Sequence, residues 1–218
     1  MGRIGRIVLA AACLVIAGCT VDGQASAGAV DLSPRAVPST DFPGGSASRV
    51  PPPAVPGALA DLTGRPLHGS VIPAQCTPAA VSADGAAVLV GPDPAASTAT
   101  FTEAIVHADV PLDEVTALAR RCPRTASGSS PTAMSAVITE VLPAPRRSGV
   151  ATGAERRQLT TGGTGSSAIT TSTTTLLAQR DGVRVIVEYR HQGAAPMSAQ
   201  AGARLDALFS RAVDAAFG

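Results

Sequence analysis

Hydrophobic and polar residues alternate along several segments in the second half of the chain, a pattern typical of β-strands with one buried face. The clearest case is a pair of segments, 167–179 and 183–191, joined by Arg-Asp-Gly at 180–182. Asp-Gly between two alternating segments is a strong β-hairpin signal. In 183–191 valines and a tyrosine take alternate positions, so we expect one face of this strand to be core and the other largely solvated.

Further elements are expected from apolar runs and from helical spacing. Strands are predicted at 86–90, 98–107, 134–142 and, with a weaker pattern, 155–162. The segment 111–122 begins with Pro, has acidic residues in its first turn and has two arginines near its end, as the helix dipole prefers. In 198–217 apolar residues recur at helical spacing with charged residues between them. A short helix is predicted at 57–64.

These elements predict one α+β domain over residues 57–218. We expect a curved, mainly antiparallel sheet, with the mid-chain helix and the C-terminal amphipathic helix packed on one face of it. The preceding segment, 19–56, is rich in Pro, Ser and Gly and has no sustained apolar period. Such a composition buries too little apolar surface to become ordered, so we expect a disordered tether.

The chain begins with two arginines among six residues, followed by an apolar run over 7–17. Eleven residues are too few to span a bilayer, which takes roughly 20, but they suit a secretory signal peptide. The run ends in Ile-Ala-Gly-Cys at 16–19, which resembles the lipobox of bacterial lipoproteins. That resemblance implies removal of residues 1–18 and lipidation of Cys19, whereas the alternative is an ordinary signal peptide with a chance cysteine.

A lipidated Cys19 carries two or three acyl chains, and each buried CH₂ contributes about 0.8 kcal/mol to membrane binding. Two chains suffice for stable anchoring. We therefore expect the domain at the extracytoplasmic face of the cell membrane, held there by its N-terminal lipid.

Composition narrows the range of partners. All 17 basic residues are arginines, and the abundance of Ala, Gly, Pro, Thr and Val suggests an actinobacterial source. Without residues 1–18 the chain would have 15 arginines against 16 acidic residues, so charge does not indicate nucleic-acid binding. One Tyr, four Phe and no Trp also leave few aromatic platforms for stacking bases.

The cysteine count indicates one disulfide. Cys13 lies within the signal and Cys19 is assigned to the lipid, so Cys76 and Cys122 remain. In an exported chain such a remaining pair predicts a disulfide. A metal site is the alternative, but the pair has no CxxC spacing and no nearby histidine.

Catalytic motifs are not found. His68, His107 and His191 are dispersed, and the chain contains neither HExxH nor GxSxG. The Gly-rich segment 161–168 lacks the Lys-Ser/Thr ending of a phosphate-binding loop, so we interpret it as a hairpin loop. The threonine run 170–175 follows from β-propensity alone. We expect no enzyme activity, cofactor or metal.

Two arginine pairs, at 146–147 and 156–157, flank one predicted loop. They are interpreted as solvated loop charge, with contact to an anionic wall or lipid group as the alternative.

The layout as a whole resembles a group of mycobacterial and related actinobacterial lipoproteins with one secreted domain. The matching features are the lipobox, the tether, "PAQC" before the first clear strand, "LARRC" at a helix end, the strand "DGVRVIVEYR" and the closing helix. More distantly, the chain is similar to the extracellular sensor domain of mycobacterial transmembrane serine/threonine kinases. That α+β domain has a helix-lined cleft thought to bind an unidentified ligand, and it usually carries two disulfides where this chain can form only one.

The leading hypothesis is a lipid-anchored, non-catalytic binding or sensor-like domain of the cell envelope. Its ligand would be an envelope lipid or a wall fragment. The alternatives are a structural or assembly lipoprotein that binds an envelope protein and, third, an envelope hydrolase.

Overall fold

The computed structural model describes residues 29–129, 134–162 and 168–218. The predicted signal peptide 1–18, Cys13, Cys19 and the first part of the predicted tether lie outside the described residues, as do residues 163–167 of the Gly-rich segment. In the described part of the chain, no helix is both long and apolar enough to cross a membrane.

The described strands form one antiparallel sheet in the order β1-β3-β4-β9-β8-β7-β6-β5-β2. Their bounds are β1 Ser48–Arg49, β2 Ser70–Ile72, β3 Ser82–Asp93, β4 Ala96–His107, β5 Arg124–Gly128, β6 Met134–Val141, β7 Ala151–Thr161, β8 Ile169–Arg180 and β9 Val183–Gln192. The α-helices are α1 Val55–Thr63, α2 Leu112–Arg121 and α3 Ala199–Phe217. Four 3₁₀ turns are η1 Ser33–Arg35, η2 Ser39–Asp41, η3 Pro52–Ala54 and η4 Ala74–Cys76.

The predicted α+β class and most predicted elements are confirmed. β8 and β9 pair about Asp181 and Gly182, whose φ angles of 51° and 73° suit a tight hairpin turn. All four other predicted strands are present in β3, β4, β6 and β7, and the three predicted helices are α1, α2 and α3. β1, β2 and β5 were not predicted, because two to five residues are too few to show an alternating pattern.

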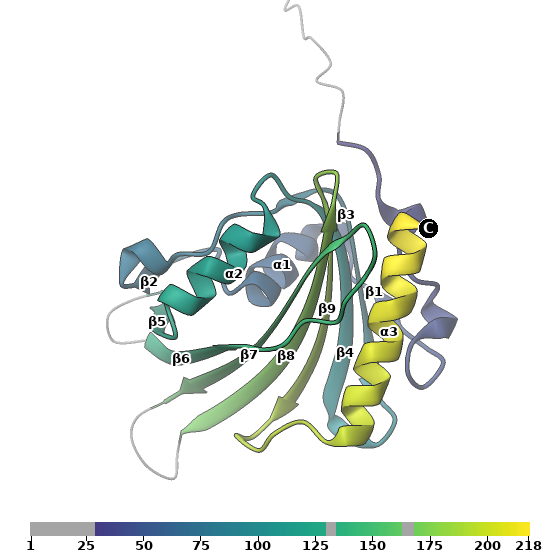
Figure 1. The fold of residues 1–218 in the computed structure, drawn as a ribbon. Coiled ribbons are helices and arrows are strands. Elements are labelled where there is room, and N and C mark those ends of the chain that lie inside the picture. Colours follow the sequence, from purple (N-terminus) through teal and green to yellow (C-terminus); the bar gives the residue numbers. More distant parts are fainter. Residues whose placement is uncertain (1–28, 130–133, 163–167) are drawn as a thin grey trace, which may run out of the picture.

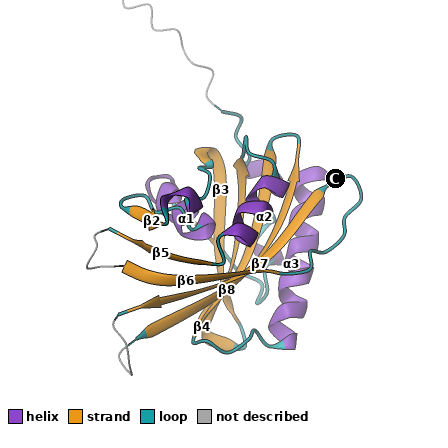
Figure 2. Cartoon of the chain, turned by 60° about the vertical axis from the view of Figure 1, so that its left-hand side comes forward, coloured by secondary structure: helices purple, strands orange, loops and turns teal. Residues whose placement is uncertain are grey.

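The helices cover both faces of the sheet, so the expectation of helices on one face is wrong. Figure 1 shows α3 along one side of the curved sheet, with α1 and α2 on the other, and Figure 2 shows the same arrangement after rotation. On one face Leu205, Leu208 and Phe209 of α3 belong to the same core as the valines of β9. On the other face, Leu59 of α1 and Leu112 of α2 pack with Leu177 and Ile186.

Because a second core covers that face, the expectation that one side of β9 is largely solvated is also wrong. Arg184 and Glu188, on the side away from α3, are 4% and 0% exposed. Arg184 is held by hydrogen bonds to Gln179 Oε1, at 2.8 and 3.0 Å, and to the carbonyl oxygen of Val110, at 2.6 Å. Charged residues at alternate positions thus lie beneath helices here, each with polar partners.

The expectation of a disordered tether is wrong for residues 30–56. Leu32, Val37 and Phe42 are 1–3% exposed and belong to the same core as α3. Backbone hydrogen bonds join Leu32 and Val50 to β3, each with an N···O distance between 2.8 and 2.9 Å. Figure 1 shows this segment in purple beside α3. Prolines favour extended chain, and apolar residues spaced between them bury surface without a regular period.

Glu103 of β4 lies under this N-terminal segment and is completely buried. Both of its carboxylate oxygens accept the backbone N–H of Val37, at 3.1 Å. Burial raises the pKa of Glu103 to about 7, and the hydrogen bond from Val37 and the charge of Arg49 offset only part of that effect. The carboxyl group is therefore more easily protonated in the folded chain than in the unfolded chain.

This shift predicts that stability depends on pH. Between about pH 4.5 and pH 7 the folded chain keeps a proton at Glu103 that the unfolded chain has released. The free energy of unfolding should therefore fall as the pH rises through this window, by about 3 kcal/mol, and level off above it. Urea denaturation at pH 4 and pH 8 measures the difference.

Glu103→Gln cannot ionise, so its free energy of unfolding should fall by about 3 kcal/mol less than that of the parent chain across this window, and it should be more stable than the parent chain at pH 8. The exposed Glu114→Gln is the matched control and should keep the parent's pH dependence. If the free energy of unfolding changed equally with pH in the parent and in Glu103→Gln, the assignment of this pH dependence to Glu103 would be contradicted.

Candidate ligand-binding cleft

A cleft of about 500 Å³ lies between α1, α2 and the face of the sheet that they cover. Small-molecule sites are commonly clefts of about 300–1,000 Å³. The walls are largely apolar and come from the loop after α1, the segment through η4, and α2. They include Leu67, Val71, Pro78, Val115, Leu118 and Ala119.

The floor of the cleft is polar, and strand register arranges it in rows. Arg157 of β7, Thr173 of β8 and Arg190 of β9 lie directly opposite one another across three adjacent strands. All three line the cleft. Opposed residues on neighbouring strands project from the same face of a sheet, so the two arginines flank the threonine.

The next row toward the core contains two glutamates with a threonine between them. It consists of Glu155, Thr175 and Glu188, which are likewise opposed across β7, β8 and β9. Glu188 is fully buried, with Oε2 lying 3.4 Å from Arg157 Nη2 and Oε1 lying 3.1 Å from Arg190 Nη2. The hydroxyl of Thr175 donates to Glu188 Oε2 at 3.3 Å. Burial raises the pKa of Glu188, while the charges of Arg157 and Arg190 act in the opposite direction.

The same arginines attach α1 to the sheet. Arg190 Nη2 lies 2.6 Å from Asp61 Oδ2, and Arg157 donates to the carbonyl oxygen of Leu62 near the C-terminal end of α1. A cation at that end of a helix is favoured by the helix dipole. Gly64 ends α1 with φ 73°, and a side chain there would collide with the Arg157 guanidinium. One wall of the cleft thus depends on these two arginines.

Two polar groups on the floor have no hydrogen-bond partner within the described parts of the chain. They are the hydroxyl of Thr173 and Nε of Arg157, and both atoms are shielded from solvent. Arg157 Nε lies 3.4 Å from Glu155 Oε1, close enough for an ion pair but without hydrogen-bond geometry. Buried polar groups are normally hydrogen-bonded, so these two are exceptions in the cleft itself.

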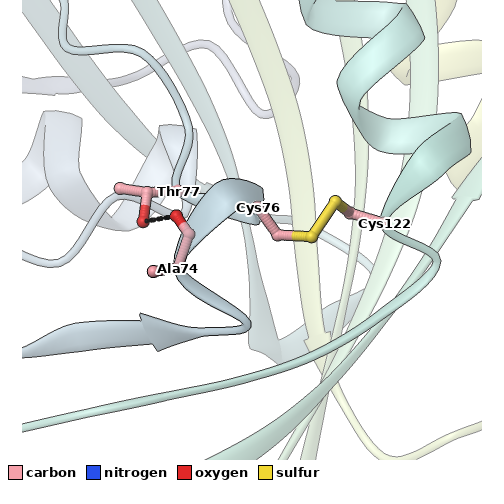
Figure 3. Close-up of a disulfide and its surroundings, with 4 residues drawn as sticks. All are labelled: Ala74, Cys76, Thr77 and Cys122. Atoms are coloured by element: carbon pink, nitrogen blue, oxygen red, sulfur yellow. Dashed lines mark hydrogen bonds between the residues drawn. A yellow bond between two sulfur atoms is a disulfide. The ribbon is translucent and has the colours of Figure 1, made fainter.

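The predicted disulfide is confirmed. Cys76 and Cys122 are bonded, and both line the cleft. Figure 3 shows the bond between the short turn η4 and the end of α2, with the hydroxyl of Thr77 donating to the carbonyl oxygen of Ala74 beside it. The disulfide joins two parts of the cleft wall that lie 46 residues apart in the sequence.

The other candidates from the sequence are not brought together. His68 lines the cleft, His107 Nε2 lies 2.9 Å from the carbonyl oxygen of Val30, and His191 packs on Tyr189 with ring centroids 5.5 Å apart. Across residues 29–129, 134–162 and 168–218, no three His, Cys, Asp or Glu residues are grouped as metal ligands.

The arginine pairs match the expectation of solvated loop charge only in part, because Arg146 is exposed but the other three arginines have partners. Arg156 and Arg157 are consecutive in β7 and so point to opposite faces of the sheet. Arg156 pairs with Glu140, at 2.7 Å, whereas the Arg157 side chain is only 13% exposed in the cleft. Arg147 donates to the hydroxyl of Ser210 on α3.

Glu188, Arg190 and Thr173 are not predicted as site residues from the sequence. A signal was present in β9, where opposite charges at 188 and 190 share a face with Ile186. Such a mixture of charged and apolar residues occurs both on exposed strand faces and around buried ion pairs. Which of the two is present depends on whether helices cover that face, and the sequence pattern of the strand does not show this.

The fold and cleft define a class: an α+β domain with one antiparallel sheet, helices on both faces and a ligand-sized cleft under two of them. No family model matches the chain, and no curated protein matches it. Among solved structures it is similar to an uncharacterised protein from Mycobacterium smegmatis, with 19% sequence identity and a TM-score of 0.43. The match covers 78% of this chain and 85% of that one.

Proposed function

We propose that this chain is a lipid-anchored lipoprotein of the cell envelope whose domain binds a small, largely apolar ligand without transforming it. The observation that carries the proposal is the cleft of about 500 Å³ with apolar walls. A volume of this size accommodates an alkyl chain or a small ring system. The resemblance of the sequence to mycobacterial lipoproteins and to a kinase sensor domain is a second support.

The polar groups of the cleft suit binding better than catalysis. Glu188 and Glu155 are in ion pairs with Arg157, so neither carboxylate is free to act as a base toward a ligand. The hydroxyl of Thr173 has no base beside it to activate it as a nucleophile, as judged from its described neighbours. The ion pairs instead link the sheet to α1, which forms a wall of the cleft.

Filling the cleft tests this function. Ala119 lies on α2 in the cleft wall, so Ala119→Trp should occupy the space that a ligand needs. We expect affinity for the neutral, apolar dye N-phenyl-1-naphthylamine to fall at least about tenfold, because the dye would lose most of its buried contact area. Fluorescence titration of the full chain carrying Cys19→Ala, which needs no detergent, measures this affinity.

Ala203→Trp provides the matched control. Ala203 is exposed on α3, on the opposite face of the sheet, so the same change there should leave dye binding intact. Envelope lipid extract should displace the dye from the control variant. Dye binding that survives Ala119→Trp would contradict the proposed site and favour a domain that binds an envelope protein.

The proposed anchor is Cys19, at the extracytoplasmic face of the cell membrane. Because the chain is packed from about residue 30 onward, Val30 follows Cys19 by only eleven positions. At 3.3–3.6 Å per extended residue, these eleven steps reach at most about 40 Å. The domain would therefore work close to the lipid surface.

Cys19→Ala should abolish incorporation of a clickable palmitate analogue and move the protein from the detergent phase to the aqueous phase of a Triton X-114 extraction. Cys13→Ala is the control within the same segment and should leave both readouts unchanged. Labelling that persists in Cys19→Ala would refute the anchor.

A further inference from the structure

We infer that the ligand of this cleft carries an uncharged, hydroxyl-bearing head, which lies on the row formed by Arg157, Thr173 and Arg190. The inference rests on the proposed function of the cleft as a binding site and specifies the chemistry of its occupant. The occupant would be an amphiphile, with its apolar part against the walls and its head on the floor.

The distribution of lining residues supports an amphiphile. The walls present aliphatic side chains such as Leu67, Val115 and Leu118. Several floor positions around the arginines are hydroxyl residues, among them Thr139 of β6 and Thr171 of β8, next to the apolar Val137 and Leu159. A purely apolar ligand would leave the hydroxyl of Thr173 without a partner, and a purely polar ligand would leave the walls exposed to water.

Thr173 is the strongest indication of a polar head. It is 7% exposed, lines the cleft, and has no hydrogen-bond partner for its hydroxyl among the residues described. Rotation about χ1 moves a threonine hydroxyl between staggered positions, so this hydroxyl can turn toward a ligand while the backbone stays fixed. A hydroxyl both donates and accepts, which matches a hydroxyl on the ligand.

The neighbouring charges select an uncharged head. Three carboxylates, from Asp61, Glu155 and Glu188, surround the two guanidinium groups of Arg157 and Arg190. Each guanidinium group is therefore already paired, and an anionic head would have to displace one of these acidic side chains. A quaternary ammonium head has neither a donor nor an acceptor for the hydroxyl of Thr173. An uncharged hydroxyl can pair with the hydroxyl of Thr173 and displaces none of these ion pairs.

A series of probes with the same octyl tail tests the inference on the full chain carrying Cys19→Ala. The heads are those of octyl β-D-glucoside, octyl sulfate, octyltrimethylammonium and methyl octyl ether, each used below its micelle concentration. Competition against N-phenyl-1-naphthylamine gives the affinities. We expect the glucoside to bind at least about tenfold more tightly than the two charged probes and the ether, since each hydrogen bond contributes a factor of about 2–12.

Thr173→Val keeps the shape of the side chain and removes the hydroxyl. It should weaken glucoside binding about 3- to 10-fold while leaving the ether unchanged, and it should keep the melting temperature because no described partner is lost. Thr170→Val, on the opposite face of the same strand, should leave all affinities unchanged.

The outcomes separate the two proposals. Equal binding of all four probes, a preference for a charged head, or equal weakening of every probe in Thr173→Val would overturn the hydroxyl head and leave the apolar cleft standing. Failure of the dye and all probes to bind would overturn the proposed function as well.

Discussion

Glu188→Ala is expected to lower the free energy of unfolding by about 3–5 kcal/mol, because it removes one partner from a buried ion-pair network. Arg157 and Arg190, with side chains 13% and 31% exposed, would lose the carboxylate that lies between them. Thr175 would lose the acceptor of its hydroxyl. Urea denaturation followed by circular dichroism measures the change.

Glu140→Ala is the control variant that separates the effect of burial from the effect of losing an ion pair. Glu140 pairs with Arg156 at 2.7 Å on the same sheet, but its side chain is 53% exposed. Exposed ion pairs contribute about 0–1 kcal/mol, so this variant should remain close to the parent. Similar losses for the two variants would contradict the view that Glu188 organises the floor of the cleft.

Loss of Glu188 should also weaken ligand binding. Arg190 reaches Asp61 of α1, and Arg157 reaches the end of the same helix, so both link the sheet to a wall of the cleft. Without the central carboxylate, the arginines repel each other across Thr173. We expect α1 to be held less firmly and the dye to bind more weakly in Glu188→Ala, with no such effect in Glu140→Ala.

Much of the fold could be predicted because periodicity reports which side of an element is buried. The alternation in β9 and the helical spacing in α3 identify the two surfaces that meet in one core. The disulfide could be predicted because only Cys76 and Cys122 remained to pair. Each of these conclusions needs only local pattern or counting.

The cleft could not be predicted, because it depends on register between strands. Arg157 and Arg190 are 33 positions apart in the sequence and meet only because both oppose Thr173. Alternation indicates which face a residue occupies but not which residue lies beside it. The second layer of helices, which turns Glu188 from a surface residue into a buried one, is likewise a property of the tertiary structure.

The N-terminal segment escaped prediction for a different reason. Composition predicts disorder when apolar residues are sparse. Leu32, Val37 and Phe42 are sparse, yet each fills a place in the core that α3 leaves open. A few well-placed side chains can thus order a segment that lacks any regular pattern, and the domain gains a covering layer over β3 and β4.

Removing the disulfide between Cys76 and Cys122 is the second change from which we expect a large loss of stability. The double variant Cys76→Ala, Cys122→Ala should lower the free energy of unfolding by about 4 kcal/mol, because the bond closes a loop across 46 residues and so limits the unfolded chain. The same variant should bind N-phenyl-1-naphthylamine more weakly, since the bond joins α2 to the opposite wall segment at η4 (Figure 3). Urea denaturation and dye titration measure the two effects.

Reduction gives the internal control for this prediction. Dithiothreitol should shift the parent chain toward the stability of the double variant and leave the double variant itself unchanged. Cys13→Ala, which alters a cysteine within the predicted signal, should keep the parent's response. If the free energy of unfolding of the double variant fell by less than about 1 kcal/mol, the disulfide would contribute little to stability beyond the hydrophobic core. If it lost stability but kept its dye affinity, the cleft walls would be positioned by α1 and the arginine network alone.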